Sequence, residues 1–212
     1  MSDEKEFELQ DILEEFSGEQ PVPEQPEPEK EKRPAGAELF EWLQMVMVCV
    51  LGAVIAFNLV VRLSVVDGQS MDPTLEHGEL MLVWSLGYSP KQGDIVILNK
   101  TTADFLDEQA IVKRVIALEG QTVDIDYGEG VVYVDGEALE EDYILEEMYL
   151  PGSGHMQQTH FEVPEDEIFV LGDNRNGSTD SRDERLGTIH EGYVLGKAVA
   201  AIWPIGKIGL IG

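Results

Sequence analysis

The sequence predicts a mostly β domain, built as a folded sheet or barrel, with one transmembrane helix before it. Two observations predict this fold class. A long uncharged apolar run lies in the N-terminal third of the 212 residues. Short runs rich in β-branched and aromatic residues follow it, each between turn signals.

Residues 1–36 form an acidic, proline-rich segment with twelve acidic and four basic residues. This composition offers too little apolar surface to offset the entropy that is lost on ordering. We therefore expect a largely disordered tail.

The run from Leu43 to Val61 contains no charged residue, and only Gln44 and Asn58 are neither apolar nor Gly. Nineteen helical residues span roughly 28 Å, about the thickness of one hydrocarbon core. A cleaved secretory signal would have a short basic leader and a shorter apolar core, whereas this leader is long and acidic. We expect a retained single-pass anchor over 37–62.

The basic residues at the ends of this segment predict its orientation, because cytoplasmic flanks carry an excess of Lys and Arg. Lys30, Lys32 and Arg33 precede the segment, whereas only Arg62 follows it closely. The sequence thus predicts a cell-membrane protein with a cytoplasmic N-terminus and an extracytoplasmic domain over 63–212.

The part of the chain after the anchor is predicted to be all β. Its short apolar runs are bounded by Gly, Pro or Asp-Gly turn signals, and Asp135-Gly136 predicts a hairpin. Residues from about 140 to 161 fit no such pattern, so we expect an insertion loop there. The predicted strands are 79–84, 94–98, 110–118, 130–134 and 167–171.

The composition of the chain excludes several classes of function. Asp and Glu number 42 against 14 Lys and Arg, which gives a net charge of −28. Nucleic-acid binding needs a basic footprint, so no nucleic-acid partner is expected. The only cysteine, Cys49, lies inside the apolar run, which excludes cysteine catalysis in a water-exposed site.

Ser70 lies in a turn shortly after the anchor. Gly68 permits backbone conformations that are closed to other residues, and Pro73 fixes the exit of the turn, so the hydroxyl would be held in one orientation. The amide of Ser70 could then help to bind an oxyanion. The alternative is an ordinary turn that opens a β domain.

Lys113 lies on a predicted strand, on the same face as Ile111 and Val115. An ammonium among apolar side chains is poorly solvated, so its pKa would fall from about 10.4 by about two to three units. Such an amine could act as a general base at neutral pH. The alternative is a lysine that extends to water or pairs with a carboxylate.

A polar loop over 172–182 follows the predicted strand 167–171. Its sequence is GDNRNGSTDSR. Asp180 and Arg182 could pair and brace this loop, and Ser178 could orient a lysine. The alternative is a plain exposed loop.

These three segments together resemble the motifs of the bacterial type I signal peptidase family. They read GQSMDPTL at 68–75, KRVIALEG at 113–120 and GDNRNGSTDSR at 172–182, and GDIV at 93–96 also matches a family element. The resemblance covers about residues 38–212. It implies a membrane-anchored serine endopeptidase that removes signal peptides from secretory preproteins after small-x-small sites such as Ala-x-Ala, without metal or cofactor.

The resemblance also implies the roles of the site residues. Ser70 would be the nucleophile and Lys113 the general base, with Ser178 orienting the lysine. Many family members complete the oxyanion hole with a hydroxyl residue where this chain has Gly68. The residues that hold the site together would be Asp173, Asp180 and Arg182. The candidates that line shallow substrate pockets are Val66, Met71, Leu75 and Val112.

The expected partners are secretory preproteins and the lipid bilayer. Trp84, Leu86 and Trp203 are candidates for lipid contact, with ordinary core packing as the alternative. Two other functions stay open. One is a non-catalytic, membrane-tethered β module that binds extended peptides. The other is a self-cleaving Ser-Lys peptidase of the DNA-damage repressor type, against which the anchor counts.

Overall fold

The computed structural model describes residues 35–100, 109–150, 152 and 154–211. The predicted acidic tail therefore lies, up to residue 34, outside the described residues. The chain forms two compact units, Met1–Val48 and Cys49–Gly212, whose boundary falls inside one long helix.

This helix, α2 (Ala35–Val60), contains almost the whole apolar run. Its stretch Gly36–Ile55 is long and apolar enough to cross a membrane, with a mean hydropathy of 1.8, and none of it is buried within the part of the chain that the structure describes. A helix of this length and composition is suited to a lipid environment. The prediction of one N-terminal apolar helix is thus confirmed, although the helix already ends at Val60.

The larger sheet has eight strands in the order β1-β2-β11-β3-β4-β9-β10, with β12 paired to β11. Every neighbouring pair is antiparallel. The long strand β11 has three register shifts, which bend it between β2 and β3 and curl the sheet. The strands are β1 (Val61–Val65), β2 (Leu80–Trp84), β3 (Ile95–Leu98), β4 (Ile111–Ala117), β9 (Glu167–Leu171), β10 (Ile189–His190), β11 (Val194–Trp203) and β12 (Gly209–Leu210).

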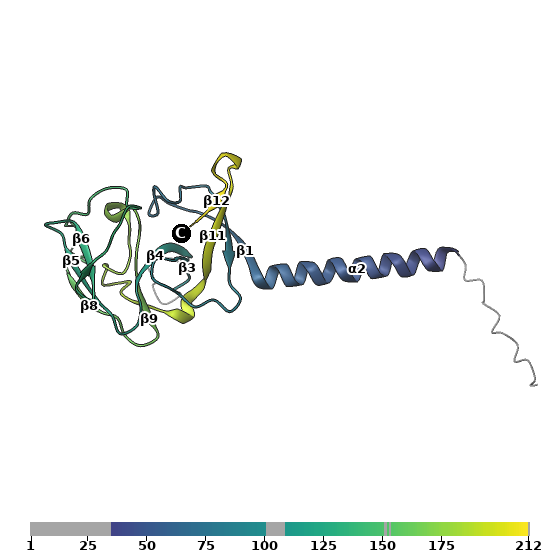
Figure 1. Cartoon of the computed structure of the whole chain (residues 1–212), viewed down its shortest axis with the longest axis horizontal. Helices are drawn as coiled ribbons and strands as arrows, with labels where there is room; N and C mark the ends of the chain where they lie inside the picture. Colours follow the sequence, from purple (N-terminus) through teal and green to yellow (C-terminus); the bar gives the residue numbers. More distant parts are fainter. Residues whose placement is uncertain (1–34, 101–108, 151, 153, 212) are drawn as a thin grey trace, which may run out of the picture. The chain divides into compact units, whose positions relative to one another are not determined.

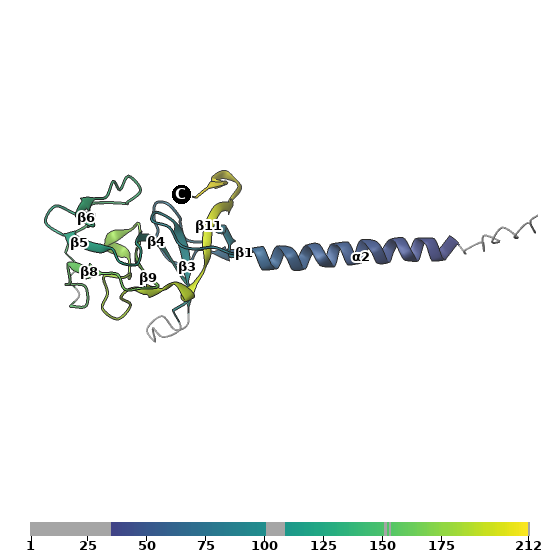
Figure 2. The same ribbon diagram turned by 60° about the horizontal axis from the view of Figure 1, so that its bottom comes forward.

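A second, four-stranded sheet has the order β7-β6-β5-β8. Asp135 and Gly136 both have positive φ, 53° and 82°, as a two-residue hairpin turn of this type requires, so the predicted hairpin is confirmed. Figures 1 and 2 show this sheet at the far side of β4 and β9 from β1 and β11. Its strands are β5 (Thr122–Asp126), β6 (Val131–Val134), β7 (Glu137–Ala138) and β8 (His160–Glu162).

The five predicted strands correspond to β2, β3, β4, β6 and β9, and a mostly β fold is confirmed. The strand β11 is not predicted from the sequence, because its bulges break the two-residue period by which a strand is recognised. The strand β1 is not predicted either, because its apolar residues continue the run of the helix without a turn signal. The described residues also form three short 3-10 helices, η2 (Arg175–Gly177), η3 (Glu191–Tyr193) and η4 (Ile205–Lys207).

One core cluster fixes the segment that carries Ser70. It contains Val66, Met71 and Leu75, from both flanks of this serine, packed with residues of β2, β3 and β11. Burial of a side chain of this size stabilises a fold by about 1.5–3 kcal/mol. The turn around Ser70 is therefore anchored on both sides by its own apolar residues.

Gly196 on β11 is required by the close approach of β2. Its φ is 155°, and a Cβ at this position would lie 2.4 Å from the backbone oxygen of Trp84 and 2.9 Å from Ser85 Oγ. We expect Gly196→Ala to lower the free energy of unfolding by about 1–3 kcal/mol, because the backbone oxygen cannot move away cheaply. Thermal denaturation of the full chain in detergent measures the loss. Gly206→Ala, where a Cβ meets nothing within 4 Å, is the control and should leave the melting temperature unchanged.

Candidate active site

Ser70 lies in the turn between β1 and β2, and its backbone is held in place from both ends. Val66 N donates to Glu79 O at 2.8 Å, and Leu75 N donates to Met71 O at 2.9 Å. Gly68 has a φ of 94°, which favours glycine. Because the turn is closed in this way, the half-buried side chain of Ser70 is presented in a fixed position.

Lys113 on β4 points its amine at this serine. Its Nζ lies 2.8 Å from Ser70 Oγ and also donates to Val112 O at 2.8 Å. The side chain is buried, with 3% of the residue exposed. The geometry therefore contradicts the alternative in which this lysine extends to water.

Burial lowers the pKa of the Lys113 amine from 10.5 to about 8. The charges of Asp180 and Asp173 act against this shift, and Arg182 adds to it. The size of the shift agrees with the drop that the strand pattern predicts. Near neutral pH, a usable fraction of the amine is thus unprotonated and can accept a proton from the hydroxyl.

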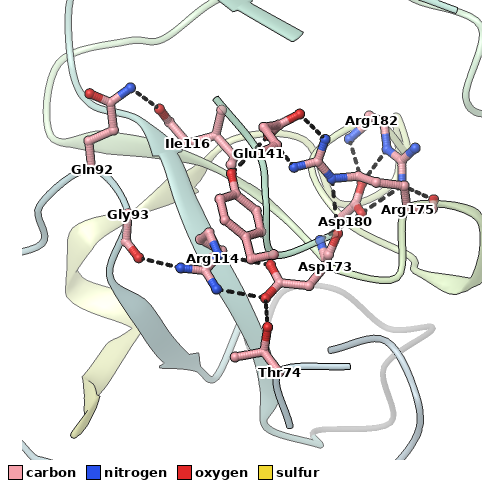
Figure 3. A network of polar contacts seen from close by, with 12 residues as sticks. Thr74, Gln92, Gly93, Arg114, Ile116, Glu141, Asp173, Arg175, Asp180 and Arg182 are labelled. Atoms are coloured by element: carbon pink, nitrogen blue, oxygen red, sulfur yellow. Dashed lines mark hydrogen bonds and ion pairs between the residues drawn. The ribbon is translucent and has the colours of Figure 1, made fainter. Parts of the chain in front are cut away.

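Each carboxylate that acts on the amine is paired with an arginine, as Figure 3 shows. Asp180 accepts from Arg182 Nε at 2.7 Å and Nη2 at 2.8 Å. Asp173 accepts from Arg114 Nε at 2.9 Å and Nη2 at 2.7 Å. Although burial opposes it, Arg182 holds the pKa of Asp180 below its usual range. These pairs limit how far the two carboxylates raise the pKa of the lysine.

The polar loop 172–182 also clamps the backbone of the serine turn. Asn174 N donates to Ser70 O at 3.1 Å, and Asn174 Nδ2 donates to Gln69 O at 3.0 Å. Thr74 Oγ1 donates to Asp173 Oδ2 at 2.5 Å, so the same loop also holds the exit of the turn. The structure thus brings the three motif segments together in one place.

Ser178 lies beside this arrangement without a hydrogen bond to the lysine. Its Oγ is buried and has no hydrogen-bond partner within the described residues. A Cβ on Gly172 would lie 2.3 Å from this Oγ and 2.5 Å from Ser70 O. Glycine at 172 is therefore what lets the loop approach Ser70 so closely.

An open cleft of about 290 Å³ lies next to the serine and the lysine. It is lined by Asp67, Ser70 and the stretch 109–113. Of the four predicted pocket residues, Val112 lies on its wall, whereas Val66, Met71 and Leu75 are buried in the core cluster against which Val112 packs. Because β9 pairs with β4 only from Arg114 onward, residues 110–112 face the cleft without a second strand partner in the described part of the chain.

Several residues around the site were missed by the sequence analysis. Arg114 follows Lys113 directly, and successive side chains on a strand point to opposite faces. For this reason the sequence does not predict that Arg114 belongs to the same network, in which it binds Asp173. Glu141 and Tyr143 belong to the segment predicted as an insertion loop, yet Glu141 pairs with the buried Arg175. An ion pair between residues this far apart in the chain has no local pattern by which it can be predicted from one sequence.

Comparisons with known proteins identify the family of the chain. Residues 39–203 match the model of one protein family, described as signal peptidase, peptidase S26. The chain is 32% identical to signal peptidase I of Leptolyngbya laminosa, over 91% of this chain and 94% of that protein. It is 32% identical to signal peptidase I of Bacillus amyloliquefaciens, over 85% and 96% of the two chains. A crystal structure of a signal peptidase I from Enterococcus faecalis is 29% identical and covers 52% of this chain and 97% of its own, with a TM-score of 0.41.

The buried amine should destabilise the fold at neutral pH. Its folded pKa of about 8 lies below the unfolded value of 10.5, so the unfolded chain binds the proton more tightly, at a cost of up to about 3 kcal/mol. Below about pH 8 this penalty is fully present, and it disappears as the pH rises towards 10.5. We expect Lys113→Met to raise the free energy of unfolding by about 1–3 kcal/mol at pH 7, because the cost of the buried charge is removed. The loss of two hydrogen bonds of the amine offsets part of this gain.

Denaturant unfolding of the full chain in detergent at several pH values measures this effect. Lys91→Met, at an exposed position, is the matched control and should change little. A gain for Lys113→Met that stays constant from pH 7 to pH 10.5 would contradict the buried, shifted amine.

Proposed function

The chain belongs to the signal peptidase family, peptidase S26, and we propose that it cleaves signal peptides from secretory preproteins with a Ser70–Lys113 dyad. The observation that carries this proposal is the 2.8 Å contact between Ser70 Oγ and a lysine amine that burial keeps partly unprotonated. A hydroxyl is a weak nucleophile until a nearby base takes its proton.

The unprotonated Lys113 Nζ takes the proton of Ser70 as Oγ attacks the carbonyl carbon of the scissile peptide bond. The resulting ammonium then donates this proton to the nitrogen of the leaving mature protein, and the C–N bond breaks. An ester between Ser70 and the signal peptide remains. Lys113 next takes a proton from water, whose oxygen attacks the ester, and Ser70 leaves with a proton as the signal peptide is released as a carboxylic acid.

Charge that develops on the carbonyl oxygen needs donors at the serine turn. The Ser70 amide is the first donor, and because Gly68 carries no hydroxyl, a backbone amide serves as the second. Asp173, Asp180 and Arg182 hold the polar loop against the dyad, and Ser178 is proposed to orient the lysine.

The substrate binds as an added strand along the free edge of 110–112, opposite Asp67 and Ser70. Val112 on the cleft wall contacts the small side chains before the scissile bond. Val66, Met71 and Leu75 fill the space behind this wall, so the pocket stays shallow and admits residues such as alanine. This accounts for a preference for Ala-x-Ala.

The outer face of β1, β2, β11 and β12 is proposed to rest on the lipid bilayer. Leu63, Val65, Trp84, Trp203 and Leu210 are large apolar residues that are exposed on this domain. The strand register places Val65 opposite Leu80 and Leu80 opposite Trp203, so the exposed residues form rows across one face. Leu86 is exposed next to Trp84, whose Nε1 donates to Leu86 O. Core packing is therefore not the role of Trp84, Leu86 or Trp203.

With the N-terminus in the cytoplasm, this face and the cleft lie on the outer side of the membrane. Ser70 follows the end of α2 at Val60 closely in sequence. A signal-peptide cleavage site lies just beyond a membrane-spanning leader, so the nucleophile and the bond are proposed to meet near the bilayer surface.

Ser70→Ala and Lys113→Ala should each lower kcat/KM for a preprotein with an Ala-x-Ala site by at least about 10³-fold, because each removes one half of the dyad. For the wild type, kcat/KM should rise about tenfold per pH unit below pH 8 and then level off, since only the unprotonated amine is active. Cleavage of purified preprotein by the full chain in detergent measures both.

Ser89→Ala and Lys91→Ala, at exposed positions, are the matched controls for these two substitutions. A preprotein with Phe before the scissile bond controls for the pocket and should not be cut. Full cleavage by Ser70→Ala would exclude the dyad. If the wild type binds the peptide without cleaving it, and Ser70→Ala binds it equally well, the non-catalytic module is favoured.

Trp203 should lie within reach of the lipid chains. In a full-length variant whose other tryptophans are replaced by Phe, we expect brominated lipids in vesicles to quench the emission of Trp203. A single-tryptophan variant with Tyr133→Trp, on the small sheet, is the control and should not be quenched. Equal emission of Trp203 in brominated and plain lipids would contradict the proposal that this face contacts the bilayer.

A further inference from the structure

Residues 141–149, called the strap below, lie against the polar loop 172–182. Leu145 N donates to Asp173 O at 3.2 Å, and Tyr149 N donates to Asn176 Oδ1 at 3.1 Å. Asn176 Nδ2 in turn donates to Glu147 O at 2.9 Å. Contacts along most of its length thus join the strap to the loop.

Two side chains of the strap bind the buried arginines of the site. The Tyr143 ring lies 3.9 Å from the guanidinium carbon of Arg114, in a cation–π contact. Tyr143 OH donates to Glu141 Oε1 at 2.8 Å, and Glu141 Oε2 accepts from Arg175 Nη1 at 2.7 Å. One tyrosine therefore covers Arg114 and connects it to the ion pair of Arg175.

Arg114 is the group through which the strap reaches the dyad. It binds both carboxylate oxygens of Asp173 and donates from Nη1 to Gly93 O at 2.9 Å. Asp173 also accepts from Thr74, which belongs to the serine turn. Any loosening of Arg114 therefore frees a carboxylate next to Lys113 and a contact that holds the turn of Ser70.

We propose that Tyr143 is a positioning residue for the dyad: its ring keeps Arg114 locked on Asp173, while Glu141 fixes the ring by its bond to Arg175. This inference rests on the proposed function only for its effect on cleavage. Tyr143 is placed to touch neither substrate nor the reacting atoms, and it acts through Arg114.

The charged groups that act on the Lys113 amine are Asp180, Asp173 and Arg182, and Arg114 neutralises the second of them. Tyr127, in the turn between β5 and β6, acts electrostatically on Arg182 in turn. Without the ring, water reaches Arg114 and its hold on Asp173 weakens. The weaker hold raises the pKa of the lysine, because Asp173 then becomes a stronger partner of the amine.

Tyr143→Leu removes the ring and Tyr143→Phe retains it, which makes them a matched pair. For Tyr143→Leu we expect the rising limb of kcat/KM against pH to move up by about 0.5–1 pH unit, which lowers the rate on the acid side by about three- to tenfold. Tyr143→Phe should restore the wild-type limb to within about 0.3 pH unit, since the cation–π contact is kept. Tyr133→Leu, on β6, controls for the loss of a tyrosine elsewhere and should not move the limb.

The pKa of Lys113 can also be read without turnover, from NMR of the full chain in detergent with ¹³Cε-labelled lysine, assigned by comparison with Lys113→Ala. A raised lysine pKa in Tyr143→Leu, with a wild-type value in Tyr143→Phe, supports the inference even if the dyad proves not to be catalytic. An unchanged lysine pKa in a folded Tyr143→Leu overturns it. If Tyr143→Leu does not fold, Tyr143→Met, which fills the space without an aromatic ring, replaces it, and an unchanged lysine pKa there counts equally against the inference.

Discussion

A buried lysine amine and two buried carboxylates lie within one small region of this domain, and the fold has to keep their charges in balance. Burial lowers the pKa of Lys113, Asp180 and Asp173 raise it, and the balance of these effects is a pKa of about 8. Each carboxylate is therefore held by an arginine, Arg182 or Arg114. Removal of one partner from such a pair costs about 3–5 kcal/mol, which explains why each carboxylate is kept in contact with its arginine.

A few neighbouring strands of the antiparallel sheet supply most of these groups. On β4, Lys113 and Arg114 are neighbours in sequence and point to opposite faces of the strand, so one strand supplies both the amine and the arginine. The polar loop begins directly after β9, the strand paired to β4 from Arg114 onward. Ser70 comes from a different part of the chain and is brought in by the core residues on its two flanks.

Much of this could be predicted from the sequence, because its signals are local. The apolar run, five strands and the Asp135-Gly136 hairpin follow from composition and period. The apolar neighbours of Lys113 on the strand suggest its burial, and the structure decides between this and the exposed alternative. Other features depend on contacts between distant segments. The strand β11 is irregular and carries no clear strand period. The roles of Glu141 and Tyr143 depend on their contacts with Arg175 and Arg114. Three of the four expected pocket residues are buried in the core.

The ion pairs around Lys113 have another consequence, which follows from how little of them is exposed. The side chains of Asp173, Asp180 and Arg182 are 0% exposed and that of Arg114 is 5% exposed. Mobile ions screen exposed charges strongly but scarcely reach groups from which water is excluded. Although the chain carries a net charge of −28, changes in ionic strength would act on its acidic exterior and leave the protonation of the interior amine almost untouched. The chemistry of this site is thereby insulated from the salinity of the medium that its surface faces.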